Sequence, residues 1–167
     1  MRTLISKALS VLVLYLASGL AVAEPPPAPN GIQMPAYFKE WRLIGLSHRT
    51  DKNSLRAILG NPTAIEAARS GQTNPWPDGA ILAKIVWQDA TLPEWDSATV
   101  PGKLQHVEFM VKDRLRYSET GGWGFARWLG EELKPYGNDA NFAQECFTCH
   151  GAAASRDHVF THPVKIP

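Results

Sequence analysis

The chain has 167 residues, with 17 basic and 16 acidic side chains and a formal charge of +1 at pH 7. A surface without a large single-sign field argues against nucleic acid or anionic lipid as the main partner. The length fits one domain, and the tryptophan, leucine and valine content is sufficient for a buried core.

The first 23 residues have the pattern of a secretory signal peptide. Arg2 and Lys7 form a basic start, residues 9–20 are apolar, and Ala-Val-Ala at 21–23 is a small-x-small cleavage site. The apolar run is too short to span a bilayer comfortably. We therefore expect cleavage after Ala23 and a periplasmic product with no membrane partner, whose formal charge falls from +1 to −1 because only the two basic residues are lost. An uncleaved N-terminal anchor is the alternative.

The mature chain is expected to begin with a short proline-rich segment. Residues 24–30 read Glu-Pro-Pro-Pro-Ala-Pro-Asn, a composition typical of a polyproline-type spacer outside the core. We assign residues 24–35 to this spacer and residues 36–167 to a single domain.

From about Tyr37, short apolar runs rich in β-branched and aromatic residues alternate with closely spaced turn residues, which favours strands. The predicted strands are residues 41–47, 55–59, 80–88, 104–112 and 124–129. Helices are predicted to be a minority beside this sheet. The expected class is α+β, predominantly an antiparallel β-sheet with a few helices.

Two helices are predicted. Asn61 is placed to cap the first, with Pro62 at its first position, residues 64–68 as its body and Gly71 as its stop. The second is expected to run from about Asp139 through the two cysteines.

The strand predicted at residues 80–88 is apolar on both faces except at Lys84. With the two-residue period of a strand, the faces are Ile81, Ala83, Ile85 and Trp87 on one side and Ala80, Leu82, Lys84 and Val86 on the other. A strand covered on both sides excludes an ammonium, so Lys84 either reaches the edge of the sheet or has a chemical task inside. Burial would lower the pKa of this lysine and favour the neutral, nucleophilic amine.

The strand at residues 104–112 also carries charge on one face. Its faces are Val107, Phe109 and Val111 on one side and His106, Glu108 and Met110 on the other. Two interpretations remain open for the second face. Either it is solvated, or it looks at a cofactor, where Glu108 would move protons and Met110 would pack against or ligate a metal.

Cys146-Phe147-Thr148-Cys149-His150 forms a CxxCH motif, the pattern of a c-type haem attachment site. The two thiols add to the haem vinyl groups, and the adjacent His150 ligates the iron. Predicted export supports this interpretation, since c-type haems are attached in the periplasm. A short-loop disulfide beside a chance histidine is the alternative. With both cysteines bound to one haem c on the C-terminal helix, the fold has no structural disulfide and depends on its core and cofactor.

Arg56 is a further charge within an apolar strand, at residues 55–59. It could pair with Glu108 or with a haem propionate. The alternative is an ordinary surface ion pair.

Together these motifs resemble the cytochrome P-460 family of periplasmic c-type haem proteins, over most of the mature chain. The CxxCH motif occurs in many families, whereas its combination with the other segments is more specific. The segments that carry the resemblance are residues 37–41, Arg56, Asp78-Gly79 with Lys84, Val107-Glu108 with residues 111–113, residues 122–125, residues 146–150 and residues 157–161.

The resemblance implies a β-rich homodimer with a five-coordinate haem and His150 as the proximal ligand. Family members that oxidise hydroxylamine carry a covalent bond from a lysine side chain to the porphyrin edge, and Lys84 falls at the matching position. Glu108 looks like the distal carboxylate that relays protons, and Arg56 like the distal arginine. The implied function is oxidation of hydroxylamine or nitric oxide, with electrons passed to a soluble periplasmic acceptor such as a cytochrome or a copper protein.

Two other classes of function compete with this one. A gas-binding or nitric-oxide-buffering protein, known within the same fold, needs an open iron but no proton relay, and its distal pocket is apolar and aromatic. A simple electron carrier needs a filled sixth coordination position. The candidate sixth ligands are His106, Met110, His158 and His162.

Overall fold

The computed structural model describes residues 24–165. The signal peptide predicted for residues 1–23 lies outside this range. Within this range the two helices are α1 (Pro62–Ser70) and α2 (Phe142–His150), and four short 3-10 segments are η1 (Phe38–Glu40), η2 (Thr50–Lys52), η3 (Ser118–Thr120) and η4 (Gly151–Arg156). No helix in the described residues is long and apolar enough to cross a membrane.

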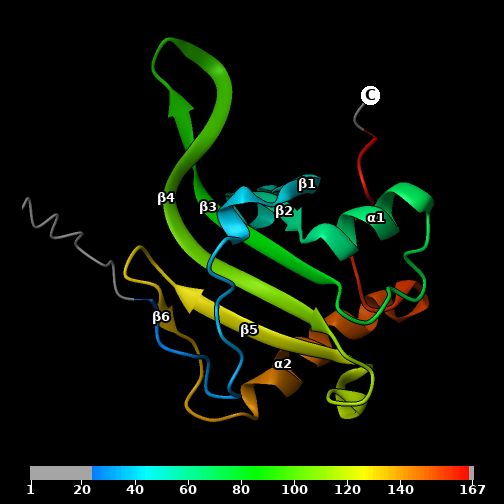
Figure 1. Ribbon diagram of the computed structural model, residues 1–167. Coiled ribbons are helices and arrows are strands. Elements are labelled where there is room, and N and C mark those ends of the chain that lie inside the picture. Colours follow the sequence, from blue (N-terminus) through cyan, green and yellow to red (C-terminus); the bar gives the residue numbers. More distant parts are fainter. Residues whose placement is uncertain (1–23, 166–167) are drawn as a thin grey trace, which may run out of the picture.

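In the described part of the chain, a single antiparallel sheet of six strands organises the fold, and each strand pairs with the next one along the chain (Figure 1). The strands are β1 (Arg42–Arg49), β2 (Ser54–Gly60), β3 (Ile81–Leu92), β4 (Trp95–Lys112), β5 (Trp123–Leu129) and β6 (Lys134–Pro135). This arrangement confirms the predicted α+β class. It also places α2, the helix that carries the CxxCH motif, after the last strand.

The first helix forms as its capping residues predict. The side chain of Asn61 accepts a hydrogen bond from the amide of Ala64 at 2.9 Å, and Pro62 occupies the first turn. Gly71 ends the helix with φ of 76°, a left-handed conformation that glycine adopts without steric cost. The second helix starts at Phe142 rather than near Asp139, because the Asp139 carboxylate accepts a local bond from the Asn141 amide instead.

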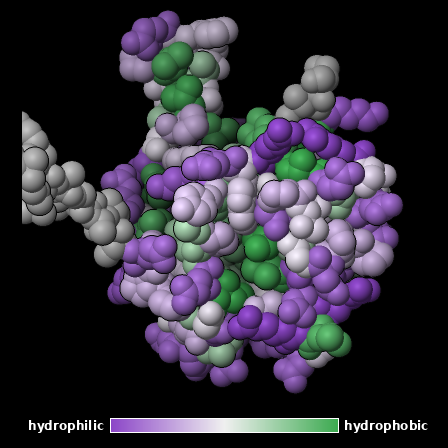
Figure 2. Space-filling view, viewed as in Figure 1, coloured by the Kyte–Doolittle hydropathy of each residue, from purple (hydrophilic) through white to green (hydrophobic). Residues whose placement is uncertain are grey.

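The β3–β4 hairpin is longer than the predicted strands at residues 80–88 and 104–112. Beyond the residues that pair with β2 and β5, Ala90 lies opposite Val100 and Leu92 opposite Trp95. These pairs form an arm that projects from the body, with apolar surface close to a hydrophilic end (Figures 1 and 2). The turn residues between the two predicted strands suggested that both strands end here. In the structure the two strands stay paired, and the irregularities appear as shifts in their register.

Residues 24–35 are not a free spacer, because the structure packs part of this segment into the core. Ala28 is 3% exposed and Ile32 is 6% exposed, in a cluster with Val107, Phe109 and Trp128. The indole Nε1 of Trp128 also donates to the carbonyl of Pro26 at 2.8 Å. Proline composition alone did not reveal the apolar residues that lie between and after the prolines.

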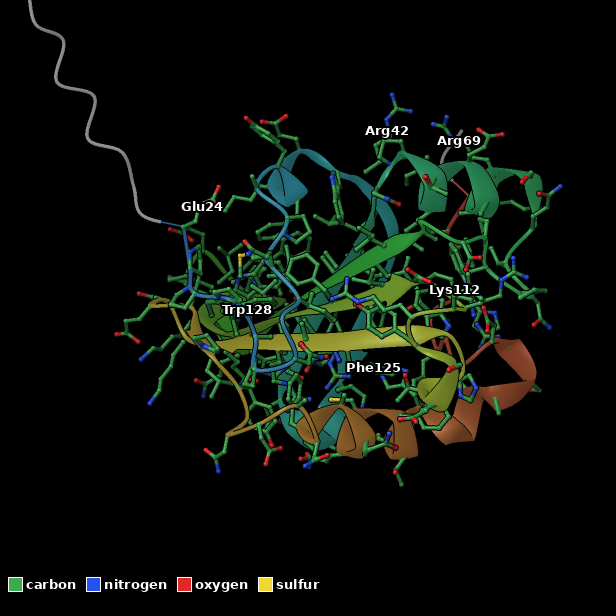
Figure 3. All side chains as sticks on the ribbon, turned by 60° about the horizontal axis from the view of Figure 1, so that its bottom comes forward. Glu24, Arg42, Arg69, Lys112, Phe125 and Trp128 are labelled. Atoms are coloured by element: carbon green, nitrogen blue, oxygen red, sulfur yellow. The ribbon has the colours of Figure 1, made fainter. Side chains whose placement is uncertain are left out.

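The alternating faces predicted for β3 and β4 are present. Ala83, Val107 and Phe109 are buried beneath the N-terminal segment. The register places Lys84 directly opposite Glu108, on the other face of the sheet. This second face is partly covered by α2, and the side chain of Phe125 lies between its own strand, β5, and that helix (Figure 3).

Candidate functional site

A cavity of about 450 Å³ lies between the second face of the sheet and the chain around α2. Its volume falls in the range of sites that hold small molecules and cofactors. The strands contribute charged groups to its walls, while α2 contributes sulfur and imidazole. All the predicted site residues line it, namely Arg56, Lys84, Glu108, Cys146, Cys149 and His150.

The two cysteines lie one helical turn apart on α2. Cys146 is half-buried and Cys149 is exposed, and both are free thiols, so the structure contains no disulfide between them. Burial raises the pKa of the Cys146 thiol. Side chains separated by three positions share one side of a helix, which allows both sulfurs to reach a single planar group in the cavity.

His150, the last residue of α2, is held in one tautomer. Its Nδ1 lies 2.7 Å from the backbone carbonyl oxygen of His158. A carbonyl only accepts, so Nδ1 carries the proton and Nε2 keeps its lone pair. Burial lowers the pKa of His150, which favours the neutral ring. A neutral imidazole with one nitrogen anchored to the backbone is the usual form of a metal-ligating histidine.

Two aromatic rings set the position of the His150 imidazole. The Phe125 ring centroid lies 5.2 Å from that of His150, and the Phe160 centroid lies at the same distance, 5.2 Å. Phe125 and Phe160 also line the cavity. Packing and hydrogen bonding therefore orient this ring before any ligand binds.

Glu108 is the centre of the charged part of the cavity. Its carboxylate pairs with Lys84, accepts from Arg127 Nε at 2.7 Å and lies 3.2 Å from His106 Nε2. Burial alone would raise the pKa of Glu108. The hydrogen bond from His106 and the charges of Lys84 and Arg127 outweigh it and hold the pKa well below its ordinary value. Glu108 is therefore an ionised carboxylate surrounded by donors.

The interpretation of Lys84 as an edge-strand lysine is wrong. β3 is an interior strand of the sheet, between β2 and β4. The expected burial is also incomplete, since the side chain of Lys84 is 28% exposed, and its ammonium pairs with Glu108. Lys84 therefore has a carboxylate partner and is not an isolated buried charge.

Arg56 lines the cavity without pairing with Glu108. No ion pair of Arg56 occurs among residues 24–165, and its buried Nε has no hydrogen-bond partner in that part of the chain. Burial lowers the pKa of Arg56, and the nearby charge of Arg49 adds to this effect. A buried guanidinium atom without a partner is unusual, and an anionic group such as a haem propionate would satisfy it. The residues present therefore fit a haem.

The four candidate sixth ligands differ in whether they line the cavity. His106 is engaged by Glu108, the His158 ring packs on Phe147 with centroids 4.9 Å apart, and His162 is exposed. Of the four candidates, only Met110 lines the cavity. The electron-carrier alternative therefore depends on Met110.

Sequence reasoning missed Arg127 and its neighbour Tyr136. Besides bonding Glu108, the Arg127 guanidinium lies 4.6 Å above the centre of the Tyr136 ring. The Tyr136 hydroxyl lies 3.1 Å from a carboxylate oxygen of Glu145. The available signal was the one used for Lys84, a lone charge inside an apolar strand.

Comparison with known families gives one match. The model of the family described as Cytochrome P460 matches residues 35–161. This span contains every predicted site residue and most of the described chain. A search of the curated proteins found no match.

Proposed function

This chain belongs to the Cytochrome P460 family and is therefore a haem-binding cytochrome, and we propose that it oxidises hydroxylamine or nitric oxide at a single c-type haem. Cys146 and Cys149 would hold the haem covalently, and Nε2 of His150 would ligate the iron. When bound, the haem would supply an iron able to bind the nitrogen ligand and to accept electrons one at a time. The protein's own side chains would hold the haem, orient the nitrogen ligand and take up its protons.

The observation that carries this proposal is the ionised Glu108 in the cavity lined by the CxxCH residues. Oxidation of hydroxylamine releases one proton for every electron, so a carboxylate beside the reacting nitrogen lowers the barrier by taking protons as electrons leave. His106, which is 23% exposed and adjoins Glu108 at 3.2 Å, offers those protons a route toward solvent.

A cluster of charged groups distinguishes this cavity from an apolar, aromatic gas-binding pocket. Arg56, Lys84, Glu108 and Arg127 all line it. A gas-binding protein has no use for a proton acceptor held between cations, because it releases its ligand unchanged. These charges therefore favour oxidation over storage of the ligand.

The cellular setting of this activity is part of the proposal. One haem stores one electron, so turnover requires an external acceptor, for which we propose a soluble periplasmic cytochrome or copper protein. We propose export to the periplasm on the strength of the signal-peptide pattern, and assembly as a homodimer on the strength of the family resemblance.

Replacing Glu108 with glutamine tests the proposed function. Steady-state hydroxylamine oxidation by the purified holoprotein, measured with an artificial electron acceptor, is expected to fall about 100-fold or more in kcat, as expected for loss of a proton acceptor. Because the pKa of Glu108 is held below its ordinary value of about 4.3, the wild-type carboxylate stays ionised down to roughly pH 5. Turnover should therefore not decline through protonation of Glu108 between pH 8 and pH 5.

The matched control is Glu66→Gln, which changes an exposed carboxylate on α1 in the same way. It is expected to retain wild-type turnover. Two results together would favour the gas-binding alternative instead. The wild-type protein would not oxidise hydroxylamine, and the Glu108→Gln variant would still bind nitric oxide.

A further inference from the structure

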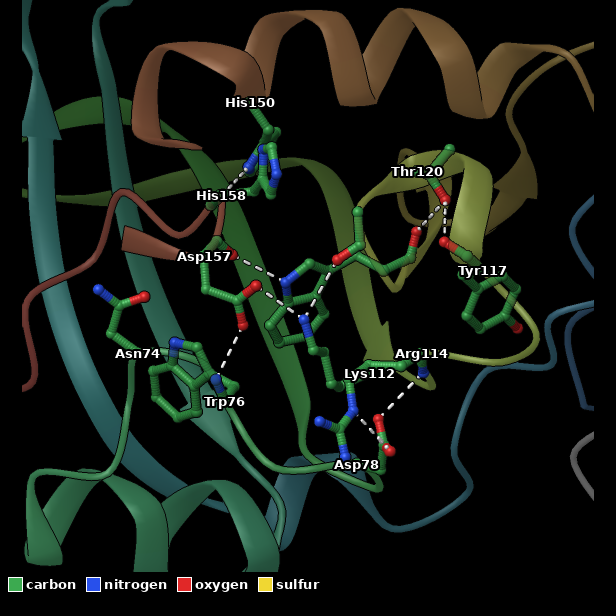
Figure 4. Close-up of polar contacts among 12 residues, drawn as sticks. Asn74, Trp76, Asp78, Lys112, Arg114, Tyr117, Thr120, His150, Asp157 and His158 are labelled. Carbon is green, nitrogen blue, oxygen red and sulfur yellow. Dashed lines mark hydrogen bonds and ion pairs between the residues drawn. The ribbon is translucent and has the colours of Figure 1, made fainter. Parts of the chain in front are cut away.

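A buried ion pair lies behind the His150 side of the cavity, outside its lining. The side chain of Lys112 at the end of β4 is 2% exposed, and its Nζ lies 2.7 Å from Oδ1 of Asp157 (Figure 4). Removing both charges from water is costly, and such pairs are often no more stabilising than apolar residues. The pair therefore calls for an explanation in terms of what it holds in place.

Lys112 ties three segments together. Besides Asp157, its ammonium donates to the carbonyl of Gly121 at 3.2 Å and lies 4.9 Å from the centre of the Trp123 ring. Its position is thus set by the β4 backbone on one side and by the start of β5 on the other. A side chain anchored in this way makes a rigid support for the carboxylate that it contacts.

Asp157 is held through both its side chain and its backbone. Its Oδ2 accepts from the Trp76 amide at 2.8 Å, while its carbonyl accepts from the Trp123 indole at 2.8 Å. These contacts keep Asp157 in a left-handed conformation with φ of 51°. Residues other than glycine occupy this region only at an energetic cost, so the surrounding contacts must enforce it.

The next residue transmits this arrangement to His150. His158 is also left-handed, with φ of 63°, and its carbonyl oxygen lies 2.7 Å from His150 Nδ1. Its ring is packed so closely that a Cβ at Gly121 would lie 2.7 Å from His158 Nε2. Two successive left-handed residues thus aim one carbonyl at the imidazole, and the Lys112–Asp157 pair holds the first of them.

We propose that Lys112 and Asp157 are positioning residues for the axial histidine. They fix the His158 carbonyl, which in turn fixes the direction and strength of the hydrogen bond from His150 Nδ1. This inference rests on the proposed role of His150 as the iron ligand. It adds Lys112 of β4 and Asp157, which follows η4, to the residues that support the proposed iron site, although neither side chain touches the cavity.

The consequence for the iron is electronic. A strong hydrogen bond from Nδ1 gives the imidazole more anionic character, so Nε2 becomes a stronger donor to the metal. A stronger donor stabilises the ferric state and lowers the reduction potential. Weakening the support should therefore lengthen the Nδ1 hydrogen bond, weaken the iron–histidine bond and raise the potential.

The test compares Lys112→Met and Asp157→Asn with a matched control in the same region. Asp78→Asn alters the exposed pair of Asp78 with Arg114 Nε at 3.0 Å, which does not contact Asp157 (Figure 4). Resonance Raman spectra of the ferrous holoproteins give the iron–histidine stretching frequency, and redox titration gives the midpoint potential. Both test variants should show a lower frequency and a higher potential than the wild type, and Asp78→Asn should show neither shift.

Lys112→Arg restores a positive charge and is expected to recover part of both shifts, which a loss of packing alone would not predict. Should Lys112→Met fail to fold, Asp157→Asn decides, since asparagine keeps the shape and an oxygen acceptor for the Trp76 amide. Folded, haem-loaded test variants with wild-type frequency and potential would overturn the positioning role. A wild-type protein without an iron–histidine band, or with one that survives His150→Ala, would remove the proposed ligand itself.

Discussion

A protein in which Cys146 and Cys149 are both replaced by alanine is expected to contain no covalently bound haem, even when produced in a strain competent in cytochrome maturation. Each thiol forms one thioether, so the double variant has no thioether to the haem. Without the thioethers no porphyrin is held beside Lys84, so the bond proposed below for that lysine is not expected to form either. Cys146 also packs against both clusters of the core. We therefore expect a lower unfolding temperature in addition to loss of the haem, because a cofactor that binds only the folded chain stabilises it.

Denaturing gel electrophoresis with haem staining measures covalent attachment, and far-ultraviolet circular dichroism follows unfolding. The matched control is Thr148→Ala, which changes one of the two residues between the cysteines and removes a methyl group and the hydroxyl that donates to the Gln144 carbonyl. It should keep its haem. A stable, haem-free wild-type protein with a Cys146–Cys149 disulfide, recovered from the same strain, would refute the attachment.

The second large effect is expected at Lys84, which we propose is bonded through its side-chain nitrogen to the porphyrin edge. Lys84 lines the same cavity as the cysteines and points from β3 toward Glu108. Starting from the Lys84 ammonium, bond formation would break two N–H bonds and one porphyrin C–H bond and form one C–N bond. Three protons would be released, and an oxidant of the peroxide class would take up the electron pair together with two of those protons. The bond would remove a full positive charge beside Glu108, which would let its pKa rise part of the way toward its ordinary value, while the hydrogen bond from His106 and the charge of Arg127 still hold it below that value.

Mass spectrometry of haem peptides after proteolysis tests this bond. In the wild type, the haem should carry both the peptide of residues 146–150 and a peptide that contains Lys84, whereas in Lys84→Ala it should carry only the first. Lys103→Ala is the control, since Lys103 is an exposed lysine of β4. Wild-type haem attached only to the cysteine peptide would make Lys84 a plain ion-pair partner and would favour the gas-binding function.

Local sequence signals predicted the elements that depend on local chemistry. The cap at Asn61 and the stop at Gly71 bound α1 because capping is decided within one helical turn. The alternation in β4 correctly separated Glu108 from Phe109, since side-chain direction follows from the period of a strand. The CxxCH motif likewise fixes its own geometry on α2.

What the sequence could not predict depends on pairing between distant segments. The position of Lys84 in an interior strand follows from strand order, which no local pattern contains. Burial of Ala28 and Ile32 requires a partner surface on Phe109 and Trp128, far along the chain. Arg127 was missed for the same reason, because its importance becomes evident only once β5 pairs with β4 and brings it to Glu108.

The network behind His150 shows a further limit. Lys112 and Asp157 each lie in a segment that supports the family resemblance, yet nothing in the sequence joins them. Their contact forms because the end of β4 and the chain after η4 meet beside the Trp123 ring. A role that acts through a backbone carbonyl has no residue signature of its own.

Magnetic circular dichroism of the ferric wild-type holoprotein tests the central claim most directly. That claim is a haem iron ligated by His150, with its sixth position open to a small nitrogen compound. The expected spectrum is that of a high-spin iron that is five-coordinate or bears a weakly bound water, and it should change on addition of hydroxylamine or nitric oxide. A low-spin spectrum of histidine–methionine or bis-histidine ligation, unchanged by either compound, would contradict the account and indicate an electron carrier with Met110 or a second histidine bound to the iron.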